Sequence, residues 1–430
     1  MKKKNKYIVL LFIAIISLLT VVLVQINMDT KSKETEKVEN TADKEKEQGG
    51  KEETDINVIT GTDKKIEELL ENMTLEEKIG QLMMVGFKGT EKSSEITELI
   101  EQKHIGGVIY FDRNMKSPKQ VAKLSNSLQQ SADRSSHSLP LMVAVDQEGG
   151  DIIRMRERVS PIPSQQELGE NASVEDMYRV AKLNGTELNS MGININFAPV
   201  LDLSKTDNRS LGKDPEKVYQ YGTKAIQGLN DASVTGALKH FPGNGRSEID
   251  PHVETSSVEA NQLDLENSDI YPFKKIISEM DNQKFFVMVT HIKYPAYDKE
   301  KPASLSKVII EDLLRGKLGF EGLVVTDDLE MGAVNKYFSY KDMGKEAILA
   351  GADLLLVCHE YSHELEVYNG LLEAVKAGEV PMERINESTK RVLTYKLYNM
   401  KQTKVDPGQA AKVVKSPESL EYINSLNLEK

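Results

Sequence analysis

The sequence predicts an α/β protein, a single (β/α)8 TIM-like barrel, from three patterns. Eight short and nearly all-apolar runs recur between residues 81 and 357. Amphipathic stretches with helical periodicity lie between them, as at residues 117–132 and 175–192. Several runs end in a charged or polar residue, which is typical of the strand ends that form the active-site face of a barrel. A doubly wound open sheet is the alternative, but eight strands at this spacing favour closure.

The eight runs have the composition of strands that are covered on both faces, because almost every residue in them is apolar. Eight βα units within about 330 residues are typical of this barrel. We therefore expect the barrel over residues 61–405 and a polar C-terminal tail over residues 406–430. The runs lie at residues 81–87, 105–110, 141–145, 193–201, 234–240, 285–291, 322–327 and 353–357.

The first 60 residues have a different character. Residues 7–24 form an uncharged apolar run that spans roughly 27 Å as a helix, close to the thickness of a bilayer core. Lysines precede this run and no small-residue cleavage site follows it. We expect residues 1–27 to be a membrane anchor, with a cleaved signal peptide as the alternative. Residues 28–60 are Lys/Glu-rich and read as a disordered linker, so the barrel would be extracytoplasmic, either tethered or secreted.

Composition excludes several classes of function. The formal net charge of −12 argues against nucleic acid as a partner, because phosphate binding needs a basic face. Cys358 is the single cysteine, so an internal disulfide framework and a cysteine-based zinc cluster are excluded. The sequence implies no metal, no organic cofactor and no protein partner.

Titratable residues collect where the predicted strands end. Lys239 and His240 end one strand, and the loop that follows carries Asp250 and His252 two residues apart. An acid at that spacing can accept a proton from one imidazole nitrogen and steady the charged ring. Asp327 ends another strand, where a carboxylate can serve as nucleophile, base, metal ligand or cap. A carboxylate nucleophile with a separate proton donor fits retaining glycoside hydrolysis, although a histidine donor would be unusual there.

Seven ordered motifs over residues 73–334 then carry a resemblance. They are MTLEEKIGQLMMVGF, VDQEGGDIIRM, GININFAPVLDL, NRSLGKDP, ALKHFPGNG, DPH and GFEGLVVTDDLEMGAV. Together they resemble glycoside hydrolase family 3, specifically its single-barrel β-N-acetylglucosaminidase branch. The resemblance implies that Asp327 is the nucleophile and that His252 is the general acid/base, with Asp250 as its partner. It also implies that the sugar ring is held by Asp146, Arg154, Arg209, Lys239 and His240.

The chain departs from the family pattern at two positions and lacks one expected part. Asn244 replaces the second histidine of K-H-F-P-G-H-G, and Pro251 replaces the serine of D-S-H. Proline fixes φ and removes a backbone donor, so we expect a stiffer loop than in the family pattern. Family members that act on plain glucosides generally place the acid/base on a second α/β domain. The residues after the last strand offer helical segments and no room for such a domain, which favours the N-acetylglucosaminidase branch.

These observations predict an exported retaining β-N-acetylglucosaminidase that acts on terminal β-linked N-acetylglucosamine of peptidoglycan-type glycans. Four alternatives stay open. One is a metal-dependent barrel hydrolase with His240, His291 and Asp327 as ligands. The others are a β-glucosidase or β-xylosidase, an N-acetylglucosaminide phosphorylase and a non-catalytic wall-binding protein. Asp328, next to the expected nucleophile, is interpreted as a capping or packing acid.

Overall fold

The computed structural model describes residues 49–247, 256–400 and 404–428, with side chains from residue 61 onward. The chain divides into two units, Met1–Lys64 and Lys65–Lys430. Helix α2 (Gly49–Asn72) begins in the first unit and ends in the second. Its first half belongs to the segment expected to be a linker, and the Lys and Glu residues there are good helix formers.

The expected membrane anchor cannot be placed, because the apolar run at residues 7–24 lies outside the described residues. Within the described part of the chain, no helix is both long enough and apolar enough to cross a membrane. The anchor therefore stays a prediction from the sequence.

The second unit is built around eight parallel strands in the order β10-β1-β2-β3-β4-β5-β6-β9. Every neighbouring pair in this order is parallel. A further parallel bridge joins Val325 of β9 to Leu354, the residue before β10, so the two ends of the sheet meet. The strands are β1 (Met83–Val85), β2 (Gly107–Tyr110), β3 (Met142–Val145), β4 (Ile195–Asn196), β5 (Thr235–Phe241), β6 (Phe285–Val289), β9 (Val324–Thr326) and β10 (Leu355–Val357).

The prediction of a barrel is therefore confirmed, and each of the eight apolar runs contains one strand. All residues of these eight strands are buried, as their mainly apolar composition predicted. β4 is much shorter than its run, because Pro199 has no N–H to donate to the ladder. Pairing with β5 resumes at the bridge between Val200 and Lys239.

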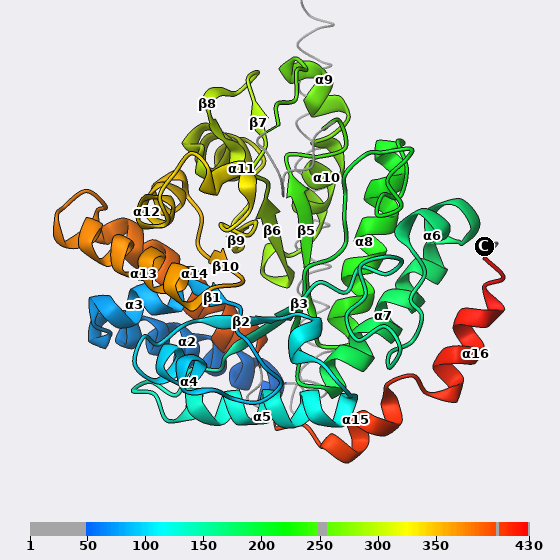
Figure 1. Cartoon of the computed structure of the whole chain (residues 1–430), viewed down its shortest axis with the longest axis horizontal. Coiled ribbons are helices and arrows are strands. Elements are labelled where there is room, and N and C mark those ends of the chain that lie inside the picture. Colours follow the sequence, from blue (N-terminus) through cyan, green and yellow to red (C-terminus); the bar gives the residue numbers. More distant parts are fainter. Residues whose placement is uncertain (1–48, 248–255, 401–403, 429–430) are drawn as a thin grey trace, which may run out of the picture. The chain divides into compact units, whose positions relative to one another are not determined.

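Helices cover the outside of the barrel (Figure 1). Side-chain caps start several of them: Ser173 forms a capping box at α7, and Ser117 precedes Pro118 at the start of α5. The helices of the second unit are α3 (Leu75–Gln81), α4 (Ser94–Glu101), α5 (Pro118–Asp133), α6 (Gln165–Asn171), α7 (Val174–Ser190), α8 (Pro215–Asp231), α9 (Gln262–Asn267), α10 (Tyr271–Glu279), a π-helical segment (Val308–Lys317), α11 (Gly332–Asn335), α12 (Tyr340–Ala350), α13 (Tyr361–Lys376), α14 (Met382–Asn399), α15 (Pro407–Val413) and α16 (Pro417–Ser425).

Two features were not expected from the sequence. A two-stranded antiparallel hairpin, β7 (Lys293–Tyr294) and β8 (Asp298–Pro302), is inserted between β6 and β9. The segment expected to be a polar tail contains α15 and α16. Ala410 of α15 is fully buried, and the backbone N–H of Lys415 donates to Glu187 of α7 at 2.8 Å.

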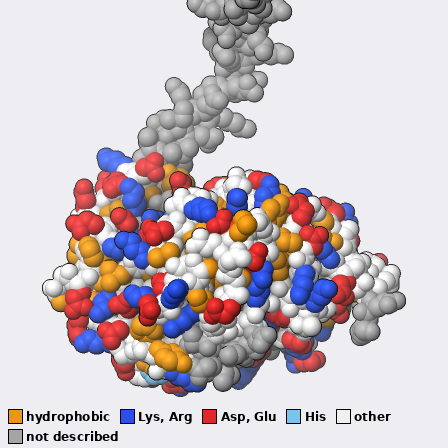
Figure 2. Space-filling view, turned by 90° about the horizontal axis from the view of Figure 1, so that it is seen from above, with side chains coloured by type: hydrophobic (Ala, Val, Ile, Leu, Met, Phe, Trp, Pro, Cys, Tyr) orange, Lys and Arg blue, Asp and Glu red, His pale blue; other side chains and the backbone are white. Residues whose placement is uncertain are grey.

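The surface carries charges of both signs. Figure 2 shows Lys and Arg side chains interspersed with Asp and Glu side chains over the face in view. The face in view therefore carries no large basic patch, in line with the net charge of −12.

Candidate active site

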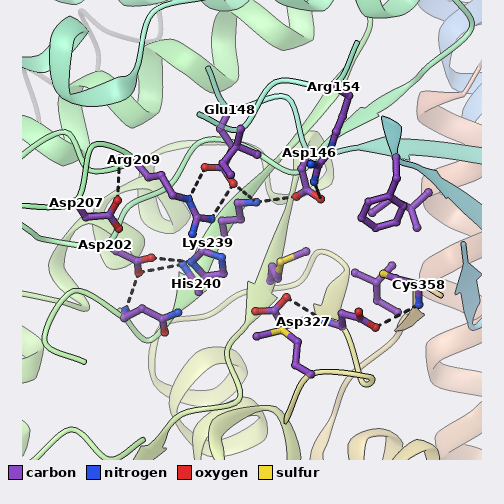
Figure 3. Close-up of a pocket in the computed structure, with 18 of the residues that line it drawn as sticks. Asp146, Glu148, Arg154, Asp202, Asp207, Arg209, Lys239, His240, Asp327 and Cys358 are labelled. Carbon is purple, nitrogen blue, oxygen red and sulfur yellow. Dashed lines mark hydrogen bonds and ion pairs between the residues drawn. The ribbon is translucent and has the colours of Figure 1, made fainter. Parts of the chain in front are cut away.

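A cavity of about 450 Å³ opens at the carboxyl ends of the barrel strands. Because all eight strands are parallel, the residues that follow them meet at this face. Six of the eight predicted site residues line the cavity, and Figure 3 shows how they lie around it. These six are Asp146, Arg154, Arg209, Lys239, His240 and Asp327.

Lys239 is the centre of a buried charge network (Figure 3). Its Nζ lies 2.9 Å from Asp146 Oδ1 and 2.7 Å from Glu148 Oε1. Glu148 also accepts two hydrogen bonds from Arg209, both of 2.8 Å, in a bidentate pair. Burial alone would raise the pKa of Glu148, but the charges of Lys239 and Arg209 lower it to about 2. Glu148 is therefore the anion that holds both cations in place.

Glu148 was not among the predicted site residues. It lies in the motif DQEGG, two residues after Asp146, and that proximity is the signal that could have identified it. The sequence alone did not reveal that its carboxylate turns inward, since an acid in a Gly-rich loop is more often solvated.

Arg154 faces the cavity, and its guanidinium makes no close contact with the carboxylates of the described residues around it. Its guanidinium lies 3.6 Å from Asp146 Oδ2 and 3.9 Å from Asp112 Oδ2, longer than hydrogen bonds. Its Nε is buried without a partner among the described residues. The group also lies over the ring of Phe111, 5.2 Å from the centroid. Such a cation can donate to the hydroxyl oxygens of a ligand.

His240 and Asp202 form a second polar unit. Nδ1 of His240 lies 2.6 Å from Asp202 Oδ2, while Asp202 Oδ1 accepts the backbone N–H groups of His240 and Asn244. Burial alone would raise the pKa of Asp202, but His240 and these donors lower it, so Asp202 is ionised. Nδ1 of His240 then carries the proton, and Nε2 is the ring nitrogen that Asp202 leaves for a ligand.

Asn244, where the sequence departs from the family pattern, also lines the cavity. Its backbone is fixed by Asp202, with 2.7 Å between the Asn244 nitrogen and Oδ1. Its side-chain Oδ1 is buried without a partner in the described structure. The substitution therefore keeps the backbone contact and leaves an amide at the cavity wall.

Asp327 follows β9 directly and is fixed by backbone contacts. Its N–H donates to Val289 O at 3.0 Å, and its Oδ1 accepts the N–H of Asp328 at 2.9 Å. Burial alone would raise the pKa of Asp327, but the nearby His240 and His291 hold it below its usual value. A rigidly held, ionised carboxylate at the mouth of the barrel is suited to nucleophilic attack.

His291 and Asp328 lie next to Asp327 and are themselves fixed by hydrogen bonds. His291 is fully buried, and its ring nitrogens lie 2.7 Å from Ser304 Oγ and 2.8 Å from the backbone oxygen of Asp328. Both nitrogens are therefore engaged, which disfavours His291 as a metal ligand. The Asp328 carboxylate accepts the N–H groups of Glu330 and Cys358, as a capping acid does.

The two remaining predicted residues, Asp250 and His252, lie outside the described residues. The chain positions on either side of their segment are known. Ser247 lines the cavity, and its hydroxyl lies 2.9 Å from that of Ser256. The roles of Asp250 and His252 stay predictions.

Comparison with known proteins gives a consistent result. The family described as glycosyl hydrolase family 3 N terminal domain matches residues 74–395. A beta-hexosaminidase A from Pseudoalteromonas piscicida is 31% identical over 75% of this chain, and this chain spans 61% of its length. A beta-hexosaminidase from Nitrosomonas eutropha is 33% identical over 65% of this chain and 80% of that protein.

A solved structure shares both sequence and fold. It is a glycoside hydrolase family 3 beta-N-acetylglucosaminidase from Paenibacillus sp. str. FPU-7, which is 37% identical with a TM-score of 0.75. The match covers 82% of this chain and 68% of that one. The family match spans the barrel from α3 to α14 and contains every predicted site residue, so the chain belongs to glycosyl hydrolase family 3 and is a glycoside hydrolase.

Proposed function

We propose that this glycoside hydrolase is an exported, retaining β-N-acetylglucosaminidase that removes terminal β-linked N-acetylglucosamine from cell-wall glycans. The observation that carries the proposal is Asp327, an ionised carboxylate fixed at the strand end beside a cluster of sugar-binding groups. The names of the relatives in Pseudoalteromonas piscicida and Paenibacillus support N-acetylhexosamine as the substrate.

The mechanism has two displacements. Asp327 attacks the anomeric carbon while the bond from that carbon to the leaving oxygen breaks, and His252 gives that oxygen its proton. A water molecule then attacks the same carbon and loses a proton to His252, while the bond to Asp327 breaks. Two inversions give net retention of the anomeric configuration.

The described residues suit the binding half of this mechanism. Asp146 can accept hydrogen bonds from sugar hydroxyls, and Arg154 can donate them, because its guanidinium lies 3.6 Å or more from the nearest carboxylates of the described residues. Lys239 and Arg209 fix the carboxylates that shape the cavity. Since these groups are held before the substrate binds, little reorganisation is needed for the reaction.

The role of His252 rests on the family resemblance and on chain connectivity. His252 precedes Ser256 by four residues, which limits the distance between their Cα atoms to about 14 Å. Ser256 in turn contacts Ser247 at the cavity wall. Chain connectivity therefore allows the proposed role of His252, and Asp250 would orient its imidazole.

Export and the cell-wall substrate are proposed from the N-terminal sequence. The run at residues 7–24 is apolar enough to anchor the chain, and the charged segment that follows would hold the barrel near the wall. Peptidoglycan-type fragments are the N-acetylglucosamine source in that compartment.

The test compares hydrolysis of nitrophenyl β-N-acetylglucosaminide and nitrophenyl β-glucoside by the full chain. We expect activity on the first sugar, a loss of more than about 10³-fold in Asp327→Ala and a smaller loss in His252→Ala. Asp231→Ala, which removes an aspartate at the far end of α8, is the matched control. A preference for the glucoside, or full activity in His252→Ala, would refute the proposed specificity or the proposed acid/base.

A further inference from the structure

We propose that a second cavity beside the active site binds an acetamido group of the leaving-group sugar, with the carboxyl group of Glu364 as its hydrogen-bond donor. This inference rests on the proposed function, because it concerns the sugar on the far side of the bond that the enzyme would cleave.

The second cavity, of about 280 Å³, lies between the loop after β1 and the start of α13. Its apolar wall is formed by Phe87, Ile96 and Leu99, which are 6%, 0% and 2% exposed. His359 lines both this cavity and the active-site cavity. The two cavities therefore adjoin at this side chain, so a sugar next to the active site lies close to the second cavity.

Glu364 is the buried polar side chain among the described residues that line this cavity. It lies in the first turn of α13 and is only 2% exposed. Its Oε1 is buried without a hydrogen-bond partner, which is rare among the buried polar atoms of the described residues. An unpaired buried oxygen is unfavourable unless a ligand or water satisfies it.

The surroundings keep this carboxyl protonated. Burial raises the pKa of Glu364 to about 9, and the negative charge of Glu330 adds to this effect, while Arg113 opposes it. Glu95 on α4 and Glu360 before α13 also disfavour its ionisation. At neutral pH the carboxyl is a neutral O–H donor, and the acids around it disfavour an anionic ligand. Other charged or titratable groups near the cavity among the described residues are Lys88, His359, Tyr361 and His363.

A neutral ligand with an acceptor oxygen and a small apolar part fits this chemistry. An acetamido group has both, because its carbonyl can accept from Glu364 and its methyl group can pack on Phe87, Ile96 and Leu99. In a glycan of N-acetylglucosamine, the sugar next to the cleaved bond carries such a group.

The cavity is also tied to the nucleophile's own loop. Glu330, three residues after Asp327, accepts the backbone N–H of Glu360 at 3.2 Å and contacts His363 of α13. Asp328 Oδ2 lies 3.2 Å from His359 Nε2. The wall that separates the two cavities is therefore fixed relative to the reacting centre.

The experiment uses two disaccharides that differ only in the leaving sugar. One is N-acetylglucosamine β-linked to N-acetylglucosamine, and the other is N-acetylglucosamine β-linked to glucose. We expect the wild-type chain to prefer the first by about tenfold in kcat/KM, the value of one hydrogen bond to a neutral group. Glu364→Leu should abolish this preference through KM, and Glu364→Gln, which keeps a neutral donor, should retain most of it.

Nitrophenyl β-N-acetylglucosaminide is the internal control, because its leaving group carries no acetamido group. Its kinetics should be unchanged in both Glu364 variants and in Glu373→Gln, an exposed acid on the same helix. In the wild type, KM for the first disaccharide should rise above about pH 9, whereas Glu364→Gln should show no such rise. A preference that survives Glu364→Leu, or an equal loss on both disaccharides, overturns the subsite and leaves the proposed function intact. Failure to cleave the nitrophenyl sugar overturns both.

Discussion

At the residue scale, the site depends on compensation among buried charges. Lys239 contacts two carboxylates, and Glu148 contacts two cations, so each charge has an opposite partner within hydrogen-bond distance. A charge taken out of water is costly unless it is paired in this way. Lys239 also holds Asp146 at the cavity, and Arg154 lies beside Asp146. Both side chains line the cavity and can form further hydrogen bonds to a ligand.

The lowered pKa of Glu148 predicts an acid-sensitive contribution to stability. Since its pKa is about 2 in the folded chain instead of 4.5, its pairing stabilises the fold fully above pH 4.5 and is lost as pH falls to about 2. The contribution is about 3 kcal/mol at neutral pH. Glu148→Gln should therefore lose less stability than the wild type between pH 5 and pH 2.5.

Denaturant unfolding at these two pH values measures the effect. Glu373→Gln, in which an exposed glutamate is replaced, is the control and should follow the wild type. If the free energy of unfolding falls by the same amount between pH 5 and pH 2.5 in Glu148→Gln and in the wild type, the network does not hold this carboxylate ionised.

At the element scale, one buried aspartate links several elements at the opposite end of the barrel. Asp353, just before β10, is fully buried and accepts the backbone N–H of Val324 at 3.0 Å. Arg315, Arg384 and Arg391 all approach its carboxylate within 3.4 Å. This cluster links β10 to β9, the π-helical segment and α14 at the amino ends of the strands, where barrel residues serve stability and not catalysis.

Asp353→Asn should consequently destabilise the fold without changing the chemistry. Removal of one partner from a buried ionic cluster costs about 3–5 kcal/mol, because the remaining charges are left uncompensated. The free energy of unfolding should fall by that amount, while kcat per folded molecule stays constant. A change below about 1 kcal/mol, the range of surface ion pairs, would mean that the arginines are satisfied elsewhere.

The elements that the sequence predicted are those with strong local signals. Each apolar run corresponds to a barrel strand, because a short and nearly continuous apolar run is typical of a strand covered on both faces. The hairpin β7–β8 was missed because β8 reads DKEKP, which lacks the alternation of a half-buried strand. Helix α15 was missed because Ala410 is its single buried residue, so the helix has no apolar stripe that the sequence pattern could reveal.

The candidate site likewise contains residues that the sequence predicted and residues that it did not. Asp327, which directly follows β9, and Lys239 and His240, which lie near the end of β5, were predicted because the sequence defines the apolar strands and their direction. Glu148 and the pairing of Asp202 with His240 depend on how loops fold back over the barrel. No local pattern encodes such loop contacts, since they join residues far apart in the chain.

At the scale of the whole molecule, the sequence predicts separate tasks for the barrel and for the N-terminal segment. The described residues that line the active-site cavity, from Ile109 to His359, all belong to the barrel. Catalysis and placement in the cell should therefore be separable.

Deletion of residues 1–48 tests this separation. The full chain should sediment with membranes in a cell fractionation, and the shortened chain should be released. Both should hydrolyse nitrophenyl β-N-acetylglucosaminide with equal kcat/KM, because the small substrate needs no positioning. Release of the full chain into the soluble fraction would count against the anchor, and a loss of activity on deletion would count against a merely positional role.

The most direct test of the central claim is to remove the nucleophile and replace it chemically. Asp327→Gly should lose hydrolysis of nitrophenyl β-N-acetylglucosaminide, and added azide should restore cleavage by entering the space of the carboxylate. Because azide attacks from the face that Asp327 would use, NMR should identify the product as the α-glycosyl azide. A β-glycosyl azide, or a variant that keeps its activity without azide, would show that Asp327 is not the nucleophile.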